Sequence, residues 1–324
     1  MTAISFPWLD QKEYPFRARY FEAQGQKMHY IDEGQGETLL FVHGTPSWSF
    51  DFRHQIEALS TQYRCVAVDH IGFGLSDKPA HFDYSVQNHA GILEAFIGHL
   101  GLKDITLVVH DFGGPIGFDY ALKHPANIKR LIVLNSWLWS AEGEPEFRKM
   151  KPILKSPLLP FLYRRLNFSP RYLLPQSFYK RSLLSKNTRR QYTGPFPGRS
   201  ERSGPLAFAK SLLMDQDWFE SLWKQIHLLA EKPILFIWGM NDTFVSPKYL
   251  EKFAIPFSRK TLARLEECGH FPQEEKRRRC WNKCGDFSPN KPELLFLGSF
   301  SANQSQWKQL PCTRNSPGIL TRSG

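Results

Sequence analysis

Short apolar runs alternate with longer amphipathic stretches in the first 135 residues, and the pattern resumes after residue 233. Several runs are almost wholly apolar, as is typical of strands buried on both faces of a sheet. The runs predict strands at 17–23, 27–32, 38–42, 64–69, 106–110, 129–134, 234–238 and 261–265. The stretches between them predict helices at 50–60, 85–100, 113–124 and 247–253. This alternation indicates an α/β fold with a mostly parallel, twisted sheet flanked by helices.

The alternation stops between residues 137 and 223, where Pro, Arg and aromatic residues are frequent. Helix-like patterns at 144–154 and 204–215 predict an inserted helical cap over the carboxyl edge of the sheet. We therefore expect a core made of 1–136 and 224–275, with the cap at 137–223. Residues 276–324 show no convincing 3.6-residue apolar period, so we expect a divergent basic tail outside this pattern.

The net charge of +11 is unevenly distributed. Residues 1–139 hold 11 Lys or Arg against 15 Asp or Glu, whereas residues 140–220 hold 15 against 7 and residues 276–324 hold 9 against 2. Such basic regions either attract anionic membranes or nucleic acid, or are solvated surface. Because no nucleic-acid motif accompanies the charge, we expect solvated surface and neither a nucleic-acid nor a membrane partner.

Targeting and redox signals are weak. The first residues lack a basic start followed by an apolar run, and no apolar stretch approaches the roughly 20 residues of a membrane span. A cytoplasmic protein is the expectation. The five cysteines match no disulfide framework, and Cys280, Cys284 and Cys312 lack a fourth ligand at the usual spacing, so no metal is expected.

The segment VVHDFGG at 108–114 has the small-x-nucleophile-x-small-small pattern of a nucleophile elbow, a sharp turn between a strand and a helix. Asp111 occupies the nucleophile position, and no G-x-S-x-G competes with it. A serine alkoxide attacks acyl carbons. A carboxylate can instead displace a leaving group from a saturated carbon, which gives an alkyl ester of the enzyme.

Two further residues follow predicted strands in the order that such an elbow requires. Asp242 comes after the strand at 234–238, and His270 comes just after the strand at 261–265. We expect His270 to activate water against the ester and Asp242 to orient the imidazole. The backbone N–H groups of Phe112 and Thr45 would hold the oxyanion. Alone, each residue could be a helix cap, a turn or a surface side chain; together and in order they favour catalysis.

The chain resembles the haloalkane dehalogenase family of the α/β-hydrolase superfamily over roughly residues 17–275. The resembling segments are HGTPSWSF (43–50), VDHIGFGLSDKP (68–79), VVHDFGGPIG (108–117), LNSWLWS (134–140), PFPGRSERSGPLAF (195–208), WGMNDTFVSP (238–247) and CGHFPQEE (268–275). The resemblance implies an α/β-hydrolase fold, nucleophile Asp111, base His270 and acid Asp242. It also implies a hydrolase without a cofactor that converts a small halogenated alkane into an alcohol, a halide and a proton.

The chain departs from that family at the leaving-group site. Familiar members place Trp directly after the nucleophile to hold the halide, whereas Phe112 offers no side-chain donor. Many members also have Asn where this chain has Thr45, whose hydroxyl can still donate. A tryptophan from elsewhere could compensate, and the candidates are Trp137, Trp139 and Trp218. The family also continues with a helix after the histidine loop, and the sequence after residue 275 does not match it.

Three other functions stay open. An epoxide hydrolase would use the same Asp–His–Asp residues with cap tyrosines that protonate the epoxide oxygen. The cap offers four such residues, Tyr163, Tyr172, Tyr179 and Tyr192. A hydrolase of haloacids or of another ester is a second alternative, and a non-catalytic binding protein with this fold is a third. The sequence carries no signal for the oligomeric state.

Overall fold

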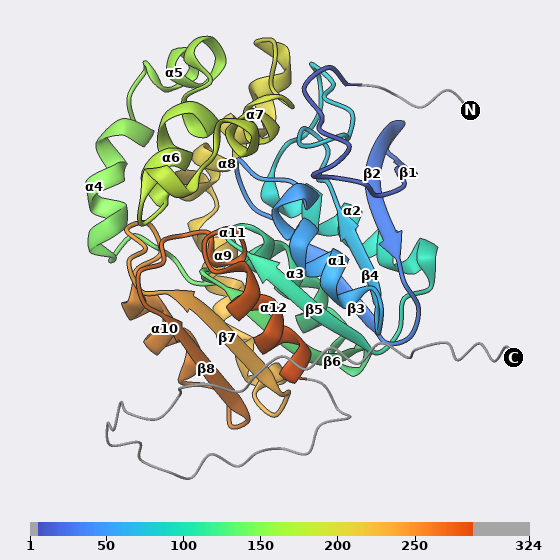
Figure 1. Ribbon diagram of the computed structural model, residues 1–324. Helices are drawn as coiled ribbons and strands as arrows, with labels where there is room; N and C mark the ends of the chain where they lie inside the picture. Colours follow the sequence, from blue (N-terminus) through green and yellow to red (C-terminus); the bar gives the residue numbers. More distant parts are fainter. Residues whose placement is uncertain (1–5, 288–324) are drawn as a thin grey trace, which may run out of the picture. The chain divides into compact units, whose positions relative to one another are not determined.

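The computed structural model describes residues 6–287, which form one eight-stranded sheet with helices on both faces (Figure 1). The strands lie in the order β1-β2-β4-β3-β5-β6-β7-β8. β1 and β2 pair antiparallel with each other and β2 pairs antiparallel with β4, whereas the remaining pairs are parallel. The strand bounds are β1 Arg19–Ala23, β2 Gln26–Glu33, β3 Thr38–Val42, β4 Arg64–Val68, β5 Ile105–His110, β6 Ile128–Leu134, β7 Ile234–Gly239 and β8 Lys260–Leu265.

The central strands are buried along their whole length, which explains their apolar sequences. Every residue of β3, β5 and β7 is buried. Each of these strands is covered by helices on both faces, so neither face needs polar side chains. The edge strand β8 has exposed positions instead and carries Lys, Thr and Arg. The predicted α/β-hydrolase fold with a mostly parallel sheet is confirmed.

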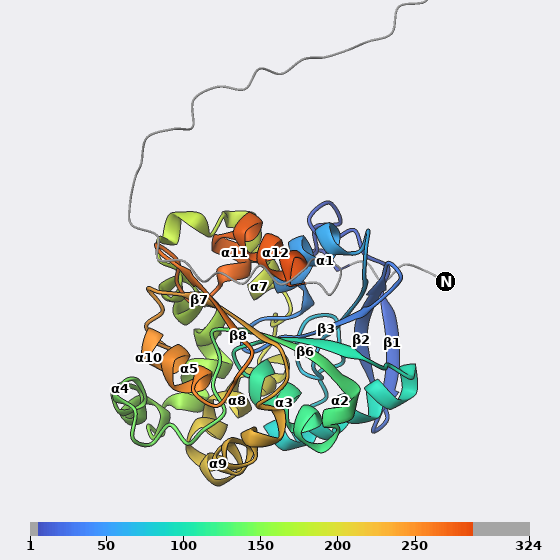
Figure 2. The same ribbon diagram turned by 90° about the horizontal axis from the view of Figure 1, so that it is seen from below.

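Helices cover the two faces of the sheet. Figure 2 shows α1 (Arg53–Leu59) and α12 (Arg277–Asp286) on one face, with α2 (Val86–Leu100) and α3 (Gly113–Lys123) on the other. Ser85 caps the first turn of α2 by accepting from the Asn88 N–H, and Gly101 ends that helix in the left-handed region. The helix α10 (Pro247–Ala254) packs its buried aromatic residues into the same core cluster as α2 and α3.

The insertion between β6 and β7 is helical, as the pattern predicts. It contains α4 (Pro145–Leu154), α5 (Leu159–Leu166), α6 (Leu174–Ser177), α7 (Lys186–Thr193), α8 (Ser203–Met214) and α9 (Gln216–Lys224). Figure 1 shows α4 to α7 gathered together on one side of the sheet. The sequence patterns at 144–154 and 204–215 correspond to α4 and α8, while α5, α6 and α7 are too short and too rich in Pro and Arg to give a clear period.

The structure differs from expectation at the start of the predicted tail. Residues Pro272–Glu275 form the short helix α11, and α12 follows it directly. α12 packs against α1, and two of its residues one turn apart, Cys280 and Cys284, are buried in the core cluster that contains Ile56 and Leu59 of α1. A helix therefore follows the histidine loop after all. Among the side chains that the structure describes, the apolar stripe consists of Cys280 and Cys284, with the partly buried Phe287 just after the helix. This stripe is too narrow to give a clear 3.6-residue period.

The remainder of that tail, including the apolar run at 294–297 and Cys312, lies outside the described residues. Within 6–287, no helix has the length and apolar character needed to cross a membrane.

Candidate active site

The backbone at Asp111 is held in a conformation that a side chain seldom adopts. Asp111 follows the last residue of β5 and precedes α3, and its φ is +52°. Such a left-handed turn presents the side chain at the tip of the strand, as a nucleophile elbow requires. A Cβ on Gly113 would lie 2.0 Å from the Val42 carbonyl oxygen, so the turn closes only with glycine there.

The Asp111 carboxylate sits among donors on both of its oxygens. Its Oδ1 accepts a hydrogen bond of 2.8 Å from the Thr45 backbone N–H, and the Phe112 backbone N–H is a second donor to the carboxylate. Its Oδ2 lies 3.4 Å from His270 Nε2. The structure thus brings together the two backbone donors and the imidazole that the sequence predicts around this residue.

Asp242 and His270 form a tight buried pair. His270 Nδ1 lies 2.6 Å from Asp242 Oδ2, and both side chains are almost fully buried. The other carboxylate oxygen of Asp242 accepts from the backbone N–H groups of Phe244 and Val245 at 2.8 and 3.1 Å. This loop after β7 therefore fixes the carboxylate, and the carboxylate fixes the imidazole.

The imidazole is strongly biased toward its charged form. Burial alone lowers the pKa of His270, but the neighbouring carboxylates of Asp242 and Asp111 outweigh burial and raise it to about 10. Burial likewise raises the pKa of Asp111, but the His270 imidazole, with the Phe112 N–H, outweighs it and holds that pKa below its usual value. At neutral pH the resting site holds an ionised Asp111 beside a protonated His270.

Two residues that sequence reasoning missed support this arrangement from the end of β6. Asn135 Nδ2 donates to Asp242 Oδ2 at 2.7 Å, and its carbonyl oxygen accepts from the Asp111 N–H at 3.2 Å. Ser136 Oγ donates to the Asp111 carbonyl oxygen at 2.7 Å. Both residues come directly after Leu134, the last residue of β6, in the segment LNSWLWS at 134–140, and two polar residues directly after an apolar strand were the available signal.

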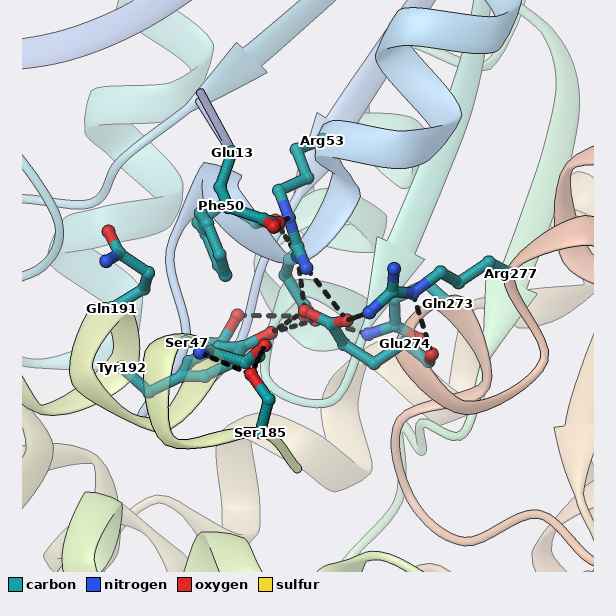
Figure 3. Close-up of polar contacts among 12 residues, drawn as sticks. Glu13, Ser47, Phe50, Arg53, Ser185, Gln191, Tyr192, Gln273, Glu274 and Arg277 are labelled. Carbon is teal, nitrogen blue, oxygen red and sulfur yellow. Dashed lines mark hydrogen bonds and ion pairs between the residues drawn. The ribbon is translucent and has the colours of Figure 1, made fainter. Parts of the chain in front are cut away.

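A second buried polar cluster lies behind the histidine loop. His110 Nε2 lies 2.8 Å from the His270 carbonyl oxygen, and its Nδ1 lies 3.2 Å from Asp51 Oδ2. The Tyr192 hydroxyl on α7 lies 3.0 Å from Asp51 Oδ1 and 2.9 Å from Glu274 Oε1 on α11. Figure 3 shows Tyr192 and Glu274 meeting there, so one hydroxyl joins the cap, the core and the histidine loop.

An arginine closes this cluster on the core side. Arg53 is almost fully buried, and its guanidinium contacts both carboxylate oxygens of Glu274, including a 3.1 Å bond from Nη2 to Oε2 (Figure 3). The same guanidinium lies 3.7 Å above the Phe50 ring centre. A two-pronged contact of this kind fixes the orientation of the carboxylate as well as its charge.

A mainly apolar cavity of about 170 Å³ lies between the sheet and the cap, above Asp111. Its walls include Asp111, His270, Thr45 and Phe112 from the core and residues from α4, α5 and α8 of the cap. A cavity of about 150 Å³ lined by aliphatic and aromatic side chains holds a benzene-sized guest. The site is therefore shaped for a small apolar molecule that reaches a carboxylate and an imidazole.

Of the three candidate tryptophans, Trp137 is the one that lines this cavity. Its Nε1 is buried and has no hydrogen-bond partner, and the same is true of Thr45 Oγ1, which also lines the cavity. Trp139 donates from Nε1 to Glu144 Oε1 at 3.0 Å and is not among the lining residues. Trp218 packs against Phe219 and is also absent from the lining.

The cap tyrosines are dispersed. Tyr163 is buried and lines the cavity, while Tyr192 lies in the polar cluster behind the histidine loop. Tyr172 and Tyr179 are exposed. Among the residues that the structure describes, no cluster of three or more His, Cys, Asp or Glu side chains is arranged to hold a metal ion.

Comparisons with known proteins agree with this geometry. Residues 37–277 match the family model of the alpha/beta hydrolase fold. Haloalkane dehalogenase 2 of Mycobacterium tuberculosis (strain ATCC 25618 / H37Rv) is 32% identical over 268 residues, covering 82% of this chain and 93% of that protein. A cis-3-alkyl-4-alkyloxetan-2-one decarboxylase of Shewanella oneidensis is 35% identical over 271 residues, covering 81% of this chain and 85% of that protein.

Solved structures give the same result. The haloalkane dehalogenase DatA of Agrobacterium tumefaciens C58 superposes with a TM-score of 0.74 at 25% identity, covering 82% of this chain and 94% of that one. The family model covers most of the chain, and the alignment with the dehalogenase of M. tuberculosis covers most of both proteins. Together they identify the fold and the class of protein. The chain therefore belongs to the haloalkane dehalogenase family of α/β-hydrolase-fold enzymes.

Proposed function

We propose that this enzyme hydrolyses carbon–halogen bonds of small haloalkanes through an alkyl ester of Asp111. The observation that carries the proposal is the Asp111 carboxylate itself, which lies at the floor of an apolar cavity, between two backbone N–H donors and the His270 imidazole. A carboxylate in this position suits displacement at a saturated carbon.

In the first step, Asp111 Oδ2 attacks the halogen-bearing carbon in line with the leaving group. One C–O bond forms, the carbon–halogen bond breaks, and the halide leaves with the bonding electron pair. Halide departure needs donors on the far side of the carbon. We propose that the indole N–H of Trp137 and the hydroxyl of Thr45, which lack partners in the cavity wall, hold it.

In the second step, water attacks the carboxyl carbon of the Asp111 ester. Esterification of Asp111 removes one carboxylate charge, which lowers the pKa of His270 and lets it lose its resting proton. His270 Nε2 then takes a proton from this water, and Asp242 stabilises the imidazolium that forms. Negative charge collects on Oδ1, where the N–H groups of Thr45 and Phe112 stabilise it. The alcohol leaves with an oxygen taken from Asp111 and with the proton that His270 gives back. One water oxygen stays in the Asp111 carboxyl group, which releases its remaining proton and becomes the carboxylate again.

A single turnover in heavy-oxygen water tests this route. The enzyme in excess over a short bromoalkane should place one heavy oxygen in the peptide that contains Asp111 and release one halide for each alcohol. The variant His270→Phe should accumulate the alkyl ester, detected as an added alkyl mass on that peptide. Label confined to the alcohol, or folded enzyme that releases no halide from a broad panel of bromoalkanes, would contradict the proposal.

A second candidate function is decarboxylation of a four-membered lactone, an oxetan-2-one, as in the name of the decarboxylase relative. It is favoured by Phe112, whose side chain has no donor for a departing halide. In such a lactone a saturated carbon is bonded to the ring oxygen, and the carboxylate that leaves this carbon stays attached to the rest of the molecule. A strong halide site is therefore not needed. Asp111 would open the ring at that carbon. Loss of carbon dioxide would then form an alkene, and the electron pair of the ester C–O bond would return to Asp111. No water is consumed.

The two candidate reactions differ in whether an oxygen from water enters the Asp111 carboxylate. The decarboxylation would leave Asp111 unlabelled in heavy-oxygen water and would release carbon dioxide and an alkene from a cis-dialkyl oxetanone. The cavity volume of about 170 Å³ favours a small substrate over a lactone with two long chains. For the epoxide alternative, Tyr163 is the one cap tyrosine from the predicted set that lines the cavity, and diol formation from an epoxide would select it.

A further inference from the structure

One segment of the cap carries a large excess of positive charge. Residues 147–200 contain 13 Lys or Arg and no Asp or Glu. All of these residues are within the described part of the chain, and twelve of the thirteen cations are exposed. The structure gives the thirteenth, Lys151, an acidic neighbour outside the segment, with its Nζ 3.7 Å from Glu142 Oε1. The surface that α4 to α7 present is therefore strongly cationic, with Glu146 at the start of α4 as the acidic residue within these four helices.

The same segment exposes large apolar side chains. Leu158 and Phe161, at the start of α5, are 62% and 53% exposed. The others are Ile153, Leu166, Tyr172, Tyr179 and Leu183. Scattered single exposures are ordinary on any protein surface. Seven within one acid-free basic segment are a specific combination of charge and apolar surface.

Part of this surface forms a shallow pocket, called a hollow below. Four cations, Arg171, Lys186, Arg189 and Arg190, line it together with Tyr172. The Arg189 side chain donates to the Arg171 carbonyl oxygen at 2.8 Å, which ties the two sides of the hollow together. A second hollow places Phe161 beside Arg164, Arg165 and Arg199. In both hollows an aromatic ring lies among guanidinium groups. Such a combination suits a ligand with an anionic head and an apolar body.

We propose that the surface of α4 to α7 docks on an anionic lipid membrane, with the cations contacting headgroup phosphates and the exposed side chains of α5 entering the interface. Lys and Arg near an anionic leaflet are attracted to it, and aliphatic and aromatic residues beside them add apolar burial. This proposal departs from the expectation of a solvated basic surface without a membrane partner, because the sequence alone does not show which apolar residues stay outside the core.

The apolar side chains favour lipid over nucleic acid. Phosphate backbones attract the same cations, and single-stranded nucleic acids also stack on aromatic rings. Leu158, Leu166 and Leu183 offer neither stacking planes nor donors, so their exposure gains nothing from a nucleic acid and gains burial from a bilayer interface.

The surface also adjoins the cavity above Asp111. Ile153 on α4 is 47% exposed and at the same time lines the cavity above Asp111. An apolar substrate dissolved in the bilayer would thus reach the cavity beside the docked face. The docking itself does not depend on the proposed reaction, so a failed halide assay leaves it standing.

Vesicle co-sedimentation of the full chain tests the proposal. We expect binding to vesicles of phosphatidylglycerol and phosphatidylcholine, no binding to phosphatidylcholine alone, and weakening with salt. The double variant Arg171→Glu/Lys186→Glu should bind at least about 30-fold more weakly, because each lost cation near an anionic surface costs about fivefold and the new carboxylates add repulsion. The double variant Leu158→Ser/Phe161→Ser should also weaken binding, with circular dichroism used to verify that each variant is folded.

Matched controls lie outside the segment. Lys224→Glu/Lys248→Glu removes two exposed cations, and Leu228→Ser/Ile255→Ser removes two exposed apolar side chains, so both should bind like the unmodified chain. Absence of binding to anionic vesicles, or equal losses in the controls, would overturn the proposal. One further outcome would overturn it: duplex DNA competes fully with the vesicles, and Leu158→Ser/Phe161→Ser binds vesicles as the unmodified chain does. Binding would then depend on charge alone and not on the exposed apolar side chains.

Discussion

In the proposed mechanism, Asp111 controls when the His270 imidazole becomes free to act as a base. In the resting site, two carboxylates raise the pKa of His270 to about 10. Alkylation of Asp111 converts one of them into a neutral ester and removes its attraction for the proton. The pKa of His270 then falls, and the imidazole becomes a usable base only when there is an ester to hydrolyse.

This coupling predicts two effects of one substitution. Asp111→Asn should abolish turnover, because the amide cannot form the ester, and should lower the pKa of His270 below about 10, because one carboxylate charge is lost. Proton NMR of the imidazole against pH measures the shift, with His270→Gln identifying the signal. Asp119→Asn removes a carboxylate of α3 that pairs with Lys123 and should change neither quantity. An unchanged His270 titration in Asp111→Asn would contradict the electrostatic account.

The leaving-group site yields a second prediction from two neighbouring tryptophans. Trp137→Phe removes an unpartnered indole N–H from the cavity wall and should lower kcat for a chloroalkane by about tenfold or more. The loss should be smaller for a bromoalkane, because bromide needs less stabilisation. Trp139→Phe removes an N–H that already donates to Glu144 and should leave halide release nearly unchanged. Equal effects of the two substitutions would remove Trp137 from the mechanism.

At the scale of elements, the elbow depends on how closely α3 approaches β3. A Cβ on Gly113 would meet the Val42 carbonyl oxygen at 2.0 Å, and backbone cannot move aside cheaply. Gly113→Ala should therefore lower the free energy of unfolding by about 2 kcal/mol or more, or prevent folding. Gly91→Ala in α2 meets nothing within 4 Å and should be neutral or raise it by about 0.5 to 1 kcal/mol. Urea denaturation distinguishes the two; similar values would refute the close approach.

The contact between α7 and the histidine loop can be tested by its effect on stability. Tyr192→Phe deletes the hydroxyl that lies between Asp51 and Glu274, leaving two buried carboxylates without it. We expect a loss of about 1 to 3 kcal/mol in the free energy of unfolding. Tyr172→Phe, on the exposed side of the cap, should cost far less. Thermal denaturation of both variants measures the difference, and a neutral Tyr192→Phe would show that the hydroxyl is not needed.

The sequence predicts the elements whose burial is visible in their own residues. It does not predict features that depend on contacts with distant parts of the chain. The strands at 38–42 and 106–110 were readable because burial on both faces forces a continuous apolar run. Asp111 and Asp242 come after such runs and His270 comes after the edge strand β8, so their order along the sequence predicts a shared site. Their catalytic roles stay a prediction. The helix α12 was not readable, since Cys280 and Cys284 are its only buried positions within the described residues. Nor could the sequence choose Trp137 over Trp139, because the free indole N–H depends on the tertiary position of Glu144.

At the scale of the whole molecule, the buried imidazole links stability to pH. The pKa of His270 is about 10 in the folded protein against a usual 6.5, so folding favours the protonated form. Its contribution is complete below about pH 6.5 and is lost as the pH rises through about 10. Between pH 7 and 10, the chain should lose more unfolding free energy than His270→Gln does, by more than about 1 kcal/mol. Parallel curves for the two proteins in urea would contradict this linkage.

The anchoring of α7 has a consequence for how molecules enter and leave. Gln191 Nε2 donates to the Trp8 carbonyl oxygen at 2.9 Å, and Trp48 Nε1 donates to the Gln191 carbonyl oxygen at 3.1 Å. With the contacts of Tyr192, these bonds hold α7 against the core. A cap fixed in this way can open only if its other helices move relative to α7. We expect α4 to be such a helix, because Ile153 is 47% exposed and also lines the cavity above Asp111.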